Sequence, residues 1–208
     1  MIQGLRFDEN SAKRADGSDF ISKTGDYIVT IKQVAAYETK MGATMLEFAL
    51  KADDGRLAFP TVCIIAKDGS ETFAWRQVQA LMKLTGVTEA PFVAGKVYRR
   101  NGEKVDGHRV PSLEGKRIGV VLQHEDREYD VNGEIRRSFQ MNVVTFFDPE
   151  TRRVAREVIN GETEAKLLDQ RLATLKDKPL KSETQQPATQ ASAQPPAGHP
   201  AFEDTDPF

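Results

Sequence analysis

Cysteine is almost absent from this sequence of 208 residues, since Cys63 is the only one. A single thiol excludes an intramolecular disulfide framework and a cluster of thiolate metal ligands. His108, His124 and His199 are scattered along the chain, and none has the spacing of a zinc ligand relative to Cys63. The sequence has neither a glycine-rich loop followed by Lys-Ser or Lys-Thr nor a His-Glu-x-x-His pair. We therefore expect no metal and no cofactor.

Long hydrophobic runs are also missing. The N-terminus lacks the apolar region of a signal peptide, and no apolar stretch approaches the length of a membrane span. We therefore expect a cytoplasmic protein that does not associate with membranes, in a cell or in a virus-infected cell.

Basic and aliphatic residues are missing from the last 27 residues, 182–208. This segment has no Lys, Arg, Leu, Ile, Val or Met, and it holds four acids and five of the ten prolines. Because such a composition cannot bury a core, we expect a disordered linker with an acidic tip. The preceding residues carry 29 basic against 27 acidic groups, a net charge of +2. A mildly basic body suits a protein that holds a polyanion, although an ordinary mixed surface fits the charge equally well.

Between a polar, flexible N-terminal arm (1–24) and the tail, residues 25–181 carry the patterns of a folded domain. Alternating apolar residues predict strands, and apolar stripes at helical spacing predict helices. We expect strands at 27–32, 44–52, 57–65, around 95–99, at 117–124 and at 134–147, and helices at 73–84 and 162–176. Asn132-Gly133 predicts a tight hairpin turn before the last strand.

This order of elements predicts a mainly β fold. Five or six strands with one helix near the middle suit an OB-fold-like barrel with one inserted helix and a C-terminal helix. A β-sandwich with appended helices is the alternative. Phe48 alternates in step with Leu46 and Leu50 and is expected in the core. Trp75 on the first helix is expected to be partly buried against the core, and a base-stacking platform is the alternative.

Basic residues gather between positions 96 and 117, in a segment predicted to be rich in loops. The segment contains seven Lys or Arg and three acids, and one tyrosine is adjacent in sequence to two of the arginines. Binding of single-stranded nucleic acid needs cations for the phosphates and exposed rings on which bases stack. This segment could therefore line a binding groove, and a solvated loop is the alternative. The candidate residues are Lys96, Tyr98, Arg99, Arg100, Lys104, Arg109, Lys116 and Arg117.

A second candidate group flanks the predicted hairpin turn and consists of Arg127, Tyr129, Arg136 and Arg137. Neighbouring acids largely cancel its charge. Since adjacent strand residues point to opposite faces, Arg136 and Arg137 cannot serve the same side. Tyr37, in a predicted turn at 37–42, is a further exposed ring.

An enzymatic function has little support in the sequence. Glu114-Gly115-Lys116 has the Glu-x-Lys form found in metal-dependent nucleases, and Asp106 could add a second carboxylate. Such a short string arises often by chance, and here it favours a tight turn before the next strand. We expect no enzymatic activity.

The last residues form an acidic cluster that ends in Pro-Phe, and its members are Phe202, Glu203, Asp204, Asp206, Pro207 and Phe208. The terminal ring can enter an apolar pocket on a partner, while its α-carboxylate and the acids meet basic groups. This tip resembles the C-terminal tip of bacterial and phage single-stranded-DNA-binding proteins, and the body is closer to the phage-encoded members. Thr205 interrupts the acidic run, and no aliphatic residue precedes Pro207.

The resemblance implies a protein that binds single-stranded DNA without sequence preference, in the host cytoplasm if a phage encodes it. It also implies that the tip recruits a helicase, primase, polymerase or recombinase. Two alternatives remain, a strand-annealing accessory protein of recombination and an adaptor without DNA affinity. The sequence leaves the oligomeric state open, a homo-oligomer included.

Overall fold

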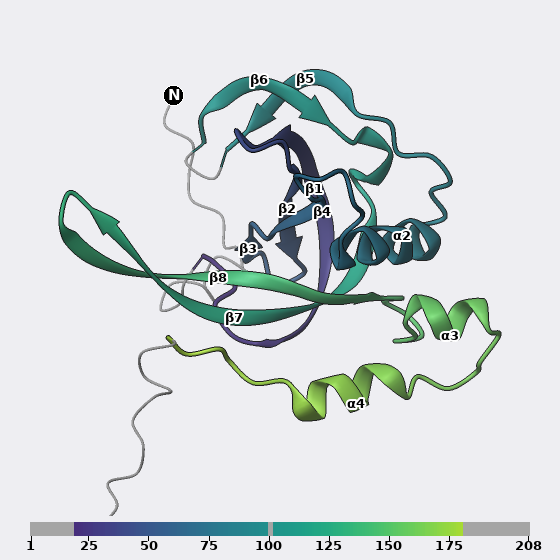
Figure 1. Cartoon of the computed structure of the whole chain (residues 1–208). Helices are drawn as coiled ribbons and strands as arrows, with labels where there is room; N and C mark the ends of the chain where they lie inside the picture. The colour runs from purple at the N-terminus through teal and green to yellow at the C-terminus, as the bar shows by residue number, and fades with distance from the viewer. Residues whose placement is uncertain (1–18, 100–101, 181–208) are drawn as a thin grey trace, which may run out of the picture.

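An antiparallel sheet of eight strands forms the centre of the structure, a computed structural model that describes residues 19–99 and 102–180 (Figure 1). The expectation of a mainly β fold is confirmed. The strands are β1 (Gly25–Glu38), β2 (Thr44–Ala52), β3 (Leu57–Ala58), β4 (Thr61–Ile65), β5 (Val93–Tyr98), β6 (Lys104–Arg109), β7 (Arg117–Val131) and β8 (Glu134–Phe147). The helical segments are α2 (Phe73–Thr85), the 3-10 turn η1 (Pro111–Leu113), α3 (Ala155–Ile159) and α4 (Leu167–Thr174). No helix in the described ranges is both long and apolar enough to cross a membrane.

Strand β1 organises the sheet because it has a different partner along each part of its length. One edge pairs with β2 from Val29 to Glu38, while the other pairs first with β7 and then, at Ala35 and Ala36, with β6. The register with β2 shifts between Ile31 and Gln33, which marks a bulge where β1 changes partner. A bulge bends a strand, and this one directs the second half of β1 toward the β5–β6 hairpin.

The sheet stays open between β4 and β8. These strands approach each other, but no backbone ladder joins them. Helix α2 fills the position instead, since the Gln77 side chain donates hydrogen bonds of 3.0 and 2.8 Å to the carbonyl oxygens of Val143 and Val144 on β8. A glutamine amide therefore satisfies two carbonyls of β8 where the sheet is open.

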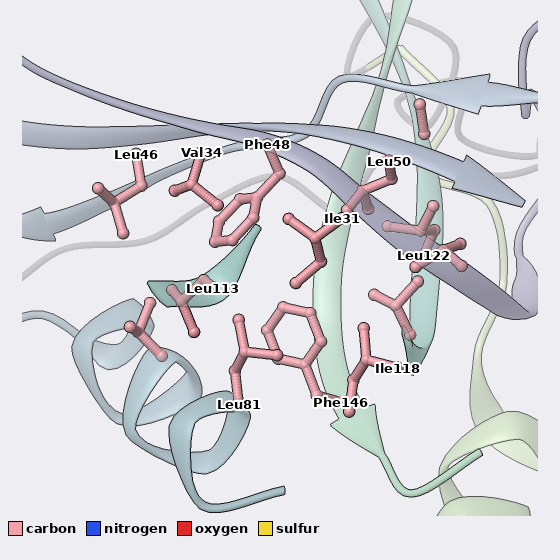
Figure 2. Packing of buried hydrophobic residues seen from close by; sticks show 14 of the residues in the cluster. Ile31, Val34, Leu46, Phe48, Leu50, Leu81, Leu113, Ile118, Leu122 and Phe146 are labelled. Carbon is pink, nitrogen blue, oxygen red and sulfur yellow. The ribbon is translucent and has the colours of Figure 1, made fainter. Parts of the chain in front are cut away.

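The main core lies between the sheet and α2. Figure 2 shows apolar side chains of β1, β2, α2, η1, β7 and β8 converging there. Phe48 is buried as expected, and its ring lies 6.2 Å from that of Phe146. Trp75 packs partly buried against this core, also as expected. A smaller apolar cluster, which includes Phe147 and Leu168, lies under α3 and α4.

Several elements differ from the sequence predictions because long-range pairing overrides local pattern. β1 continues through Tyr37, which was expected in a turn, because Tyr37 pairs with Met45 on β2. The loop-rich stretch contains the complete β5–β6 hairpin. Helix α3 was not predicted, and α4 covers only eight residues of the expected 162–176 helix.

The carboxylate of Glu157 lies where α4 begins. It accepts backbone hydrogen bonds from Val154, which precedes α3, and from Lys166 and Leu167 at the start of α4. Burial of Glu157 opposes its ionisation, but these hydrogen bonds outweigh burial and hold its pKa below the usual value. One buried carboxylate thus joins two helix starts.

The described part of the expected N-terminal arm is packed against the body. Ile21 is buried, and its N–H donates to the carbonyl oxygen of Leu57 at 2.8 Å. His124 on β7 lies 2.7 Å from the carbonyl oxygen of Ser22 through Nδ1 and 2.9 Å from the Asp126 carboxylate through Nε2. Since both partners accept hydrogen bonds, a protonated imidazole satisfies both.

The pKa of His124 reflects these contacts. Partial burial lowers it, but the hydrogen bonds with Asp126 and Ser22 and the charge of Asp177 together raise it above the ordinary value. Its ring also stacks on Phe139 at 4.9 Å. These contacts favour the protonated form of His124, and its ring joins residues 19–24 to the sheet.

Candidate nucleic-acid interface

Two exposed tyrosines line one groove on the surface of the sheet. Tyr37, near the end of β1, is 44% exposed, and Tyr98, at the end of β5, is 53% exposed. The groove between them has a volume of about 460 Å³, and its walls come from β1, β2 and the β5–β6 hairpin. Rings that flank an open groove can stack on nucleobases. The structure thus brings together two rings that are 61 positions apart in the sequence, Tyr37 and Tyr98.

A buried glutamine on β1 holds Tyr98 in place. Gln33 is only 6% exposed, and its side-chain amide makes two hydrogen bonds with the Tyr98 backbone. Nε2 donates to the carbonyl oxygen at 3.0 Å, and Oε1 accepts from the N–H at 2.9 Å. No backbone ladder joins β1 to β5, so the amide of Gln33 takes the place of a neighbouring strand.

The phenol of Tyr37 stays neutral. Partial burial, and after it the carboxylate of Glu47 in the same groove, raise the pKa of Tyr37. A neutral ring does not repel phosphates and keeps its face available for stacking.

Two lysines lie on the β5–β6 hairpin beside the groove. Lys104 faces Tyr98 across the hairpin, and its Nζ lies 5.5 Å from the ring centroid, within reach of a cation–π interaction. Lys96 faces Asp106, and the two side chains form an exposed ion pair of 2.7 Å. The hairpin therefore supplies one lysine next to the exposed ring of Tyr98 and another that is already paired.

Arg99 also lines the groove and forms an exposed pair of 3.7 Å with Glu103. Exposed ion pairs contribute about 0–1 kcal/mol, so a phosphate can replace the carboxylate at little cost. The pairing of Arg99 and Lys96 therefore leaves both cations able to contact a phosphate.

Arg109 has a structural role instead. Its guanidinium makes two hydrogen bonds with the carboxylate of Glu114, which is mostly buried and also accepts the Val34 N–H at 3.2 Å. Releasing Arg109 to a phosphate would leave that carboxylate without its cation, which makes the exchange costly. The sequence prediction of a DNA contact at Arg109 therefore has no support in the structure.

The carboxylates that suggested a nuclease, Glu114 and Asp106, are both engaged in ion pairs. Glu114 is occupied by Arg109 and Val34, and Asp106 pairs with Lys96 on the hairpin. Within residues 19–99 and 102–180, no group of three or more His, Cys, Asp or Glu side chains could hold a metal ion.

Lys116 and Arg117 lie where β7 begins, and neither lines the groove. Arg117 forms an exposed ion pair of 2.8 Å with Asp53 in the turn between β2 and β3. Lys116 is exposed, and its carbonyl oxygen accepts the N–H of Ile31. The basic segment expected from the sequence is therefore spread over more than one surface.

The β7–β8 hairpin projects from the body at the left of Figure 1. Its Asn-Gly turn is confirmed, with φ values of 57° and 86°. Tyr129 pairs directly with Arg136, so these two and Arg127 share one face, while Arg137 faces Glu128 on the other. Each arginine has a carboxylate partner on its own face: Arg127–Glu125 at 3.3 Å, Arg136–Glu134 at 3.5 Å and Arg137–Glu128 at 3.0 Å.

Only the face with Tyr129 combines a ring with two arginines. None of the hairpin residues lines the groove between Tyr37 and Tyr98. The hairpin is therefore a separate, secondary candidate surface.

Comparisons with known proteins add no assignment. No family model and no curated protein matches this chain. Arg100 and the C-terminal tip, Phe202 to Phe208, lie outside the described residues. The observations that bear on function are therefore those of the groove and its surroundings.

Sequence reasoning missed Gln33, although a signal was present. Gln33 follows Val29 and Ile31 at the same alternating positions of β1, so the pattern places its polar side chain on the buried face. Buried amides need partners, and this predicts a structural hydrogen bond there. Its partner, Tyr98, is 65 residues away and could not be identified from spacing.

Proposed function

We propose that this protein binds single-stranded DNA without sequence preference and is not an enzyme. The observation that carries the proposal is the groove with Tyr37 on one strand and Tyr98 on another, both exposed. Stacking on such rings is tolerant of sequence because every base has a π face. Lys104 at Tyr98 and the exchangeable pairs of Lys96 and Arg99 supply cations for the phosphates.

The strand order supports an OB-like fold for the sheet as part of this proposal. On one side of β1 lie β2 and β4, and on the other lie β7 and β8, with α2 in the chain between β4 and β7. An OB barrel has this arrangement and closes between its third and fifth strands, where β4 and β8 here approach each other beside Gln77. The β5–β6 hairpin is then an insertion that forms one wall of the groove.

The acidic tip completes the proposal by recruiting partner enzymes of replication, recombination or repair. Phe208, Pro207 and Asp206 are the residues we expect a partner to recognise. This part rests on the sequence and on the resemblance of the tip to that of single-stranded-DNA-binding proteins.

Fluorescence anisotropy of a labelled oligo-dT tests the binding at two salt concentrations. We expect binding that weakens steeply with salt and is much weaker for duplex. Tyr98→Ala should reduce the affinity about five- to 150-fold, since stacking contributes about 1–3 kcal/mol per base. Phe73→Ala is the matched control, because Phe73 is 66% exposed on α2 and does not line the groove. Equal affinity of both variants and the wild type would contradict the proposed site.

A further inference from the structure

A second hollow adjoins the groove on the other side of Tyr37. It has a volume of about 350 Å³ and is lined by Ala36, Tyr37, Glu38, Thr44, Phe92 and His108. Ala36 and Tyr37 line both the groove and this hollow, so the two spaces meet at these residues. Tyr37 thus lines two neighbouring spaces.

Phe92 forms an aromatic wall of the second hollow. It lies just before β5 and is 47% exposed. A single exposed apolar residue is ordinary, but a half-exposed ring beside a hollow that already contains Tyr37 is a stacking surface. Tyr98 and Tyr37 therefore line the groove, and Tyr37 and Phe92 line the second hollow, so that three aromatic residues border the two joined spaces.

His108 supplies a polar group to the same hollow. It is exposed on β6 and pairs with Ala36 on β1 and with Ala94 on β5, which fixes its position on the sheet. Its ring nitrogens can donate to or accept from the edge of a base. Glu38 at this hollow repels phosphates, so the chemistry favours a base over the sugar-phosphate backbone.

We propose that this second hollow, between Tyr37 and Phe92, is a further base-binding subsite for single-stranded nucleic acid. The bound strand then passes across Tyr37 and places bases on both sides of that ring. The inference rests on the proposed function, because the continuity of the second hollow with the groove is what identifies a nucleic-acid strand as its occupant.

Anisotropy with the full chain and an oligo-dT of about 16 nucleotides, the upper end of the site size of one such domain, tests the subsite. Phe92→Ala should weaken binding about five- to 150-fold, the range expected for losing one stacked base. Because Phe92 and Tyr98 would contact different bases, the two fold-changes should multiply in the double variant. Tyr37→Ala should reduce the affinity at least as much as the more damaging of Phe92→Ala and Tyr98→Ala, since Tyr37 would contact bases on both sides.

Phe92 also borders an apolar hollow over α2, so its replacement by alanine can disturb packing. Phe92→Leu keeps most of the apolar volume but removes the flat ring, and thermal unfolding of each variant shows whether the fold is retained. A folded Phe92→Leu variant should still bind more weakly than the wild type. Phe73→Ala should bind like the wild type.

The possible failures can be told apart. If Tyr98→Ala weakens binding while Phe92→Leu and Phe92→Ala bind like Phe73→Ala, the second subsite is refuted and the proposed function stands. If the wild-type protein does not bind oligo-dT at low salt, the proposed function and the subsite are both refuted.

Discussion

Replacing Gln33 by methionine should weaken DNA binding only through Tyr98. Methionine has a similar length and no amide, so Gln33→Met removes both hydrogen bonds to the Tyr98 backbone while keeping the buried volume. At about 0.5–1.5 kcal/mol net for each hydrogen bond, the free energy of unfolding should fall by about 1–3 kcal/mol. The end of β5 then loses its attachment to β1, and the ring of Tyr98 is no longer held beside the groove.

The loss of affinity has an upper limit that follows from this role. Gln33→Met cannot weaken binding by more than Tyr98→Ala, for which stacking predicts a loss of about 1–3 kcal/mol. Gln33→Glu should weaken binding similarly, because a carboxylate oxygen would face the carbonyl oxygen of Tyr98 and the charge would be buried.

A double-mutant cycle with oligo-dT anisotropy, alongside denaturant unfolding, measures this coupling. We expect Gln33→Met to reduce affinity in the wild-type background and to have no further effect in a Tyr98→Ala background. A general loss of structure would lower affinity in both backgrounds. Equal losses in the two backgrounds would therefore refute the positioning role of Gln33.

Three further predictions concern the stability of the fold. Gly119→Ala should lower the free energy of unfolding by about 1–3 kcal/mol, because the Phe147 ring occupies the space of the added methyl group, and denaturant unfolding measures this loss. Glu157→Gln should lower the free energy of unfolding by about 1–3 kcal/mol, since an amide cannot accept all three backbone hydrogen bonds, and thermal unfolding should show a lower melting temperature. The pKa of His124 is raised in the folded state, so its contribution is complete below the ordinary value of 6.5 and is lost as the pH rises through the folded-state pKa. Unfolding as a function of pH should show this loss in the wild type and not in His124→Gln.

Local patterns predicted much of the fold. The alternation of apolar and polar residues predicted that Phe48 lies in the core, and Asn132-Gly133 predicted the hairpin turn. Both features depend on residues that are neighbours in the sequence. The extension of β1 and the β5–β6 hairpin depend on pairing between distant segments, and α4 begins where the carboxylate of Glu157 accepts backbone N–H groups. Such contacts leave no periodic signal.

The candidate site was predicted in part. Tyr37 and Tyr98 were both expected to be exposed, but only the folded chain brings them to one groove. The charge count suggested a basic surface between residues 96 and 117, whereas the structure pairs most of its cations with carboxylates. Arg109 shows why a count of basic residues does not identify phosphate ligands, since its guanidinium is paired with the mostly buried carboxylate of Glu114.

Photo-crosslinking tests the central claim most directly, because it reports where a bound strand lies. An iodouracil-substituted single strand should be irradiated with the full chain and the modified peptides identified by mass spectrometry. We expect adducts at Tyr37 and Tyr98, with loss of the corresponding adduct in each alanine variant. Adducts confined to α3 and α4, or to the β7–β8 hairpin, would contradict the placement of single-stranded DNA in the groove between the two tyrosines.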